Sequence, residues 1–144
     1  MPDDIAERCN TIEECYEFML AYAAQGVPAE AASASGARIR EFLNAAVSAI
    51  SGLTECCAMT VKQQGLEPSG PYDEFIAVVG RDARDSLAAI GLVLAQPSIS
   101  SQLIDNLNAS IHLRALLTDL FLLSDIFELN APASVKVADS SDAL

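Results

Sequence analysis

The fold is decided by residues 39–60, IREFLNAAVSAISGLTECCAMT. Apolar or small side chains recur here at alternating steps of four and three residues, at Ile39, Leu43, Ala46, Ile50, Leu53, Cys57 and Thr60. This spacing places them all on one side of an α-helix, and no charged residue occurs between Phe42 and Thr54. The pattern predicts one long helix, ending near Gly65, that neighbouring helices cover on most sides.

Helical patterns also occur on both sides of this segment. Thr11 and Glu14 form a capping-box pattern that opens a helix ending at Gly26. A third helix opens at Asp73, and its apolar or small positions are Ile76, Gly80, Ala83, Leu87, Ile90 and Leu94. The last helix starts within residues 98–101 and runs to Leu129. With short connections and no strand pattern, the sequence predicts an all-α fold, an antiparallel four-helix bundle with up-down-up-down topology.

The 144-residue chain is long enough for one domain with its own core. We expect an N-terminal extension over 1–10, the helical bundle domain over 11–129 and a flexible acidic tail over 130–144. The helix predicted over 39–64 is apolar on more sides than one small bundle would cover. We therefore expect the protein to be a homodimer.

The charge balance restricts the classes of partner. Twenty acidic residues against eight Lys and Arg give a net charge of −12, which disfavours both nucleic acid and anionic membranes. The opening residues, MPDDIAER, differ from the basic and then apolar start of a secretory signal, and no segment resembles a membrane span. Four cysteines in a domain of this size do not imply a disulfide framework. We expect a cytoplasmic protein with reduced thiols.

One histidine is present, His112, and it is followed by Arg114. The segment 110–116 resembles histidine phosphotransfer domains, which are acidic four-helix bundles whose phosphate-accepting histidine precedes a basic residue. Arg114 stands one place before the family's usual lysine, and Ala115 and Leu116 occupy the positions of that lysine and a glycine. The resemblance implies a phosphate acceptor at His112, with Arg114 as the cation that steadies the phosphoryl group.

The four cysteines offer a second chemical hypothesis. Antiparallel packing of the first two helices would bring Cys9, Cys15, Cys56 and Cys57 to one end of the bundle, where thiolates suit Zn²⁺ or Cu⁺ or a redox role. However, no CxxC spacing is present, and the adjacent Cys56 and Cys57 point about 100° apart on a helix. The alternative interpretation is core packing, which is common for free cysteines.

A group of charged residues interrupts the apolar third and fourth helices. It comprises Arg81, Asp82, Asp85, Arg114 and Asp119. Counting outward from the turn near residue 97, position 81 pairs with 113 and position 76 with 118, so we expect Arg114 to lie near the charges of the third helix. Such a group could fix the helix register or bind an anionic ligand between helices.

No complete catalytic set can be assembled from these residues. A di-iron bundle needs two Glu-x-x-His motifs, and the seven glycines form no phosphate-binding loop. We therefore predict a protein that is not an enzyme and needs no cofactor. It would act as an adaptor, chaperone or regulator that binds another protein, with acidic surface around an apolar groove suited to a basic amphipathic helix. Phosphotransfer through His112 and thiol chemistry are the alternatives.

Overall fold

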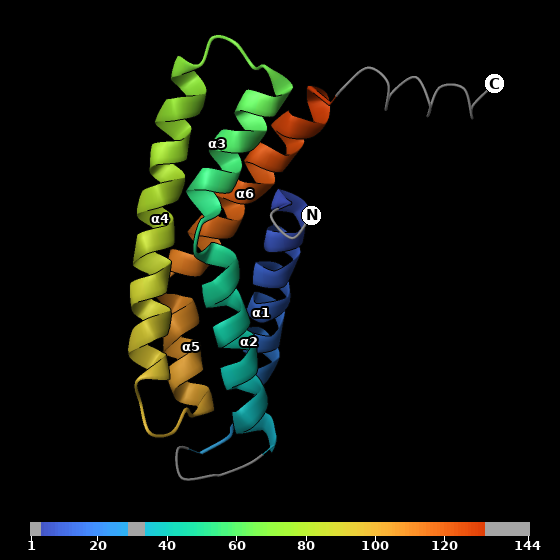
Figure 1. Ribbon diagram of the computed structural model, residues 1–144. Helices are drawn as coiled ribbons and strands as arrows, with labels where there is room; N and C mark the ends of the chain where they lie inside the picture. Colours follow the sequence, from blue (N-terminus) through green and yellow to red (C-terminus); the bar gives the residue numbers. More distant parts are fainter. Residues whose placement is uncertain (1–3, 29–33, 132–144) are drawn as a thin grey trace, which may run out of the picture.

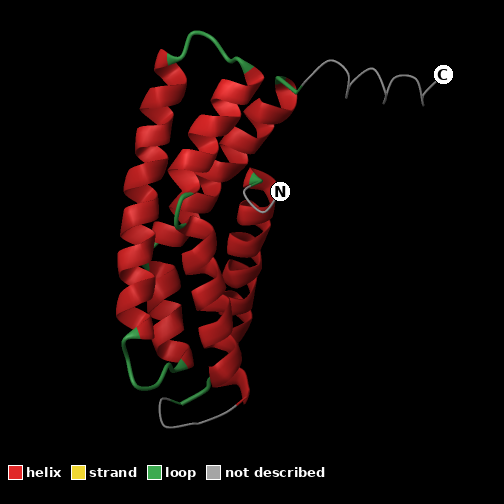
Figure 2. Ribbon diagram, viewed as in Figure 1, coloured by secondary structure: helices red, strands yellow, loops and turns green. Residues whose placement is uncertain are grey.

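The computed structural model describes residues 4–28 and 34–131, and this part of the chain consists of helices joined by loops, without strands (Figure 2). The predicted all-α class is therefore confirmed. Six helices follow one another: α1 (Ile5–Gln25), α2 (Ala34–Ile50), α3 (Leu53–Gln64), α4 (Gly70–Leu94), α5 (Ser101–Ala109) and α6 (His112–Leu129).

The helices lie roughly along one long axis (Figure 1). Helix α4 runs the whole length of the molecule, α2 continues into α3 across a bend of 44°, and α5 is followed by α6. Helix α1 packs chiefly on α2 and α5, whereas α6 packs chiefly on α4 and α1. Figure 1 also shows that α1 begins partway along the axis, so that α3, α4 and α6 extend beyond its first residue.

The segment 39–60 forms the predicted buried stripe but not one continuous helix. Its apolar positions from Ile39 to Cys57 are at most 2% exposed. The helix nevertheless breaks at Gly52, whose φ of 80° lies in the left-handed region that glycine adopts without a side-chain clash. Arg8 of α1 stabilises this break, because its Nη1 donates hydrogen bonds to the carbonyls of Ala49 (2.9 Å) and Ser51 (2.6 Å) at the end of α2.

The first helix starts earlier than the sequence predicts. Asp4 caps it by accepting a hydrogen bond from the Ala6 amide (3.1 Å), so residues 5–10 of the expected extension are helical. The Thr11 hydroxyl donates to the Glu7 carbonyl instead of capping a helix start. The prediction failed because Ile5 is a core residue, and its burial extends the helix beyond the local capping-box pattern.

The predicted fourth helix is also two helices, α5 and α6. The break lies at Ser110 and Ile111, and Ile111 has a φ of 64°, which is uncommon for a β-branched residue. Helix α5 packs chiefly on α1, whereas α6 packs chiefly on α4. The α6 residue that faces a given α4 residue therefore lies further along the chain than it would in one continuous helix. Of the tail predicted over 130–144, residues 132–144 lie outside the described part.

The buried face of α4 is rotated by one position from the predicted one. Its buried residues are Val79, Ala83, Ser86, Ile90 and Val93, whereas Ile76, Gly80, Leu87 and Leu94 are half-buried. Gly80 allows α4 to approach α3 closely, since a Cβ at this position would lie 3.3 Å from Cγ2 of Thr54 on α3.

A buried polar clamp joins the end of α1 to the start of α5. Ser101 is 3% exposed, and its hydroxyl donates to the Tyr22 carbonyl (2.5 Å) and accepts from the Val27 amide (2.7 Å). The Tyr22 hydroxyl in turn donates to the Ile99 carbonyl (2.6 Å). These bonds satisfy backbone groups that the end of α1 would otherwise bury without a partner.

Among the described residues, no single helix has both the length and the apolar composition needed to cross a membrane. Only the joined pair Gly36–Ile50 and Leu53–Gln64 meets these two criteria, and it is bent by 44°.

Candidate functional site

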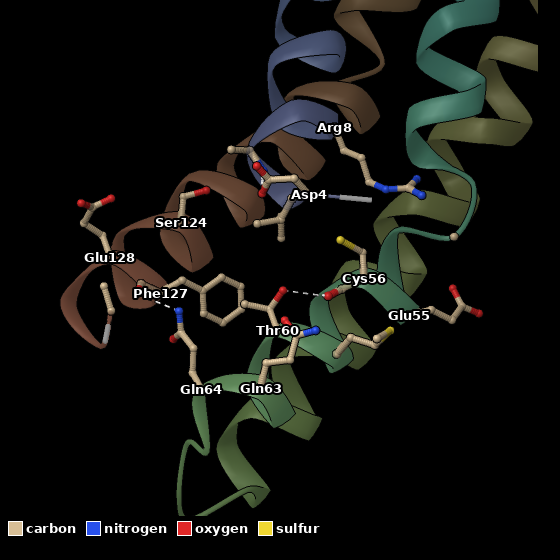
Figure 3. Close-up of a pocket in the computed structure, with 15 residues that line it drawn as sticks. Asp4, Arg8, Glu55, Cys56, Thr60, Gln63, Gln64, Ser124, Phe127 and Glu128 are labelled. Carbon is tan, nitrogen blue, oxygen red and sulfur yellow. Dashed lines mark hydrogen bonds between the residues drawn. The ribbon is translucent and has the colours of Figure 1, made fainter. Parts of the chain in front are cut away.

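A groove of about 860 Å³ opens at the end of the molecule where α3 and α6 extend beyond the start of α1 (Figures 1 and 3). It is lined by the first residues of α1, by one side of α3 and by the last two turns of α6. We call it the end groove. Its volume is within the range of protein sites that enclose the side chains of a bound partner or a small ligand.

The floor of the end groove is apolar. Ile5, Cys56 and Phe127 contribute buried side chains from α1, α3 and α6 respectively. Met59 of α3 also lines the groove and is 58% exposed, which is high for a large hydrophobic side chain. A flexible thioether at a surface site is typical of surfaces that adapt to apolar partners.

The rim of the end groove is acidic. Asp4, Glu55 and Glu128 all line it, are exposed and come from three different helices. Among the described residues that line the groove, one side chain is cationic, that of Arg8, and its Nη1 donates hydrogen bonds to the two carbonyls at the end of α2. The groove therefore presents negative charge around an apolar floor.

Polar contacts hold the walls of the groove in place. The Gln64 amide donates to the Phe127 carbonyl (3.3 Å) and so links α3 to α6, while the Thr60 hydroxyl donates back to the Cys56 carbonyl within α3 (2.9 Å) (Figure 3). On α3 the lining positions Cys56, Met59, Thr60 and Gln63 follow helical spacing, so one continuous side of this helix faces the groove.

The predicted charged group is only partly brought together. The carboxyl groups of Asp82 of α4 and Asp119 of α6 lie next to each other across the helix interface. Burial and the neighbouring Asp82 carboxylate raise the pKa of Asp119 to about 7. Asp119 therefore gains a proton as the pH falls through about 7, and two neighbouring carboxyl groups do not favour the binding of an anion.

This pair predicts a pH-dependent stability. Because the pKa of Asp119 is raised in the folded state, the folded protein binds this proton more tightly than the unfolded chain does. This tighter binding stabilises the fold fully below about pH 4, and the stabilisation is lost as the pH rises through 7. The free energy of unfolding of the Asp119→Asn variant should therefore equal that of the wild type near pH 4. At pH 8 it should exceed the wild-type value by about 2 kcal/mol, after allowance for solvent screening. Urea unfolding at several pH values measures this, and the exposed Asp105→Asn is the control, for which we expect no such trend.

The other members of the charged group lie apart from this pair. Arg81, Asp85 and Arg114 are exposed, and among the described residues no ion pair joins Arg114 to Asp82 or Asp85. His112 is half-buried and is the first residue of α6, directly after the break at Ile111. The structure thus places His112 and Arg114 in the first turn of a helix, two residues apart.

The thiols do not assemble into a metal site. All four cysteines are free and buried, and within residues 4–28 and 34–131 no three His, Cys, Asp or Glu side chains are grouped to hold a metal ion. Burial raises the pKa of both Cys15 and Cys57 to about 12, so these two remain thiols at neutral pH. The sulfhydryl of Cys15 contacts the Met19 sulfur at 3.8 Å, as expected of a core residue.

Sequence reasoning missed the end groove. Its residues come from positions 4–8, 52–64 and 124–131, which share no motif, and the early start of α1 was not predicted. The one available signal was Met59, an apolar residue outside the buried stripe of its helix. The chain matches no family model, no curated protein and no solved structure, so its function is inferred from this geometry.

Proposed function

We propose that this protein binds another protein, as an adaptor, chaperone or regulator, by accepting a basic amphipathic helix in the end groove. The observation that carries the proposal is the combination of an apolar floor at Ile5, Met59 and Phe127 with a rim of carboxylates. A helix that presents apolar side chains on one face and Lys or Arg on its flanks complements both features.

The arrangement of the helices supports a helical occupant. We infer that α2 with α3, and α5 with α6, act as two bent rods, so that the six helices correspond to an up-down-up-down four-helix bundle. Beyond the start of α1, the described part of this bundle consists of α3, α4 and α6 (Figure 1). A partner helix in the end groove would supply the fourth rod there and would bury apolar surface against α3 and α6.

The proposal includes the cellular location and the oligomeric state of the protein. We propose a cytoplasmic protein, since its four cysteines are all free and its acidic surface suits a partner with basic residues. We also propose that it is a homodimer. The end groove binds its partner within one chain, so this function does not depend on dimerisation.

The binding test uses a defined probe. A fluorescein-labelled helical peptide of about 15 residues, with Leu at helical spacing on one face and Lys on the flanks, should bind the wild-type protein in a fluorescence-anisotropy titration. Glu55→Lys reverses one rim charge and Met59→Asp places a charge on the floor. Each should weaken binding about tenfold, which corresponds to roughly 1.4 kcal/mol.

Two controls separate groove binding from general attraction to an acidic protein. Glu41→Lys makes the same charge change on the exposed side of α2, away from the groove, and should alter the affinity less than twofold. A peptide with Glu in place of Lys should not bind. If Glu41→Lys weakens binding as much as Glu55→Lys, or if the Lys peptide does not bind the wild type, the proposal is wrong.

A further inference from the structure

The exposed hydrophobic side chains are concentrated on α6. The described residues have seven exposed large hydrophobics, and four of them lie on the solvent side of α6 and its N-cap: Ile111 (59% exposed), Phe121 (45%), Leu122 (49%) and Leu129 (72%). By contrast, Met59 is the one such residue from the apolar segment 39–60. The apolar surface that could bring two copies together therefore belongs to α6, not to the helices that the sequence pointed to.

These residues form one continuous helix face. Positions 111, 118 and 125 repeat every seven residues, as do 114, 121 and 128, and the residues at all six positions are exposed. Leu122 and Leu129 widen the face on one side. Positions seven residues apart lie on nearly one side of a helix, along which a second helix can pack. Ile111 and Phe121 are the apolar members of these six positions, and the other four are polar. We call these eight residues the outer face of α6.

Charge placement indicates which partner fits this face. Arg114 lies near one end and Asp125 near the other, eleven residues apart, or about 16 Å along the helix. If two α6 helices pack antiparallel about a two-fold axis, Arg114 of each copy lies opposite Asp125 of the other. The same register places Thr118 opposite Phe121 of the second copy, so the two Phe121 side chains lie on either side of the two-fold axis, close to it. A two-fold interface requires this kind of self-complementarity.

We infer that the outer face of α6 is a homodimer interface, in which two copies pack antiparallel and Arg114 of each pairs with Asp125 of the other. This inference rests on the homodimer proposed above and identifies its surface. One helix pair buries less area than the roughly 1,600 Å² of a standard interface, so the dimer should be weak, with a Kd of about 10 µM. Apart from Glu128, which belongs to both surfaces, the end groove and this interface use different residues.

The test is a charge exchange followed by sedimentation equilibrium on the full chain. Arg114→Glu and Asp125→Arg should each raise the dimer Kd at least about tenfold, because each places like charges opposite one another. The double variant carrying both changes should return the Kd to within about threefold of the wild type. Within one chain these residues are too far apart to interact, so only pairing between copies explains recovery.

The control and the other outcomes are equally specific. Arg84→Glu makes the same charge change on the exposed side of α4 and should leave the Kd unchanged, and circular dichroism should show that every variant stays helical. A monomeric wild type at about 100 µM, or a double variant that does not recover, would overturn the inference. Two variants distinguish the dimer from helix binding in the end groove. The Arg114→Glu variant should bind the Lys peptide with normal affinity in the anisotropy titration, and the Glu55→Lys variant should dimerise normally in sedimentation equilibrium.

Discussion

Replacing Arg8 with Met should lower the free energy of unfolding by about 3 kcal/mol, the largest effect expected of any charged residue in this protein. The Nη1 atom of Arg8 donates to the carbonyls of Ala49 and Ser51, where α2 ends and the chain bends at Gly52. Met keeps the apolar stem but removes the charged donor, so the two carbonyls lose their partner. The cation also stabilises the negative end of the α2 dipole, and this contribution is lost as well.

Urea unfolding monitored by circular dichroism measures this effect. Arg84→Met is the matched control, because Arg84 is exposed on α4 and its replacement should change the free energy of unfolding by no more than about 0.5 kcal/mol. An Arg8→Met variant as stable as Arg84→Met would show that the bend between α2 and α3 does not depend on Arg8. In the variant we also expect weaker peptide binding, since Arg8 lines the end groove and positions the start of α3.

Ser101→Ala should cost about 2–3 kcal/mol, a large effect for the loss of one oxygen atom. Ser101 is buried, and its hydroxyl satisfies both the Tyr22 carbonyl and the Val27 amide at the end of α1. Alanine removes the partner of the buried Tyr22 carbonyl and of the partly buried Val27 amide, and the penalty for leaving such groups unsatisfied exceeds the net value of a typical hydrogen bond. The melting temperature should fall by about 8 °C for a chain of this size.

Two neighbouring serines provide a graded comparison for this prediction. Ser100 accepts a hydrogen bond from the Leu103 amide as the N-cap of α5, so Ser100→Ala should cost about 1 kcal/mol. Ser48 is exposed on α2, and Ser48→Ala should be nearly neutral. If the three losses do not follow the order Ser101, Ser100, Ser48, the clamp does not contribute as described.

The sequence predicted the helical class and the buried stripe of residues 39–57 because both depend on local spacing. The breaks at Gly52 and Ile111 were not predicted, since tertiary contacts decide them. Arg8 reaches from another helix to satisfy the carbonyls exposed at Gly52, and no pattern near residue 52 contains that information. Likewise, the register of α4 against α6 depends on where α5 turns away, so Asp119 meets Asp82 and Arg114 does not.

The position of the candidate site was not predicted from the sequence. Binding of a basic helix through acidic surface around an apolar groove stays a prediction, and the end groove, with its apolar floor and acidic rim, is where we place it. Its residues could not be chosen from the sequence, because the groove exists only where α1 begins short of α3 and α6. The predicted charged group instead contains two neighbouring carboxyl groups, those of Asp82 and Asp119, and the four thiols belong to buried core residues.

The most direct test of helix binding in the end groove uses the methionine methyl groups. Met59 lines the groove, whereas Met19 is fully buried in the core and serves as an internal control. In a protein labelled with ¹³C at the methionine methyls and titrated with the Lys peptide, the Met59 signal, assigned with Met59→Leu, should shift until binding saturates while Met19 stays in place. A Met59 signal that does not move at saturating peptide, or a Met19 signal that moves equally, would contradict the proposed function.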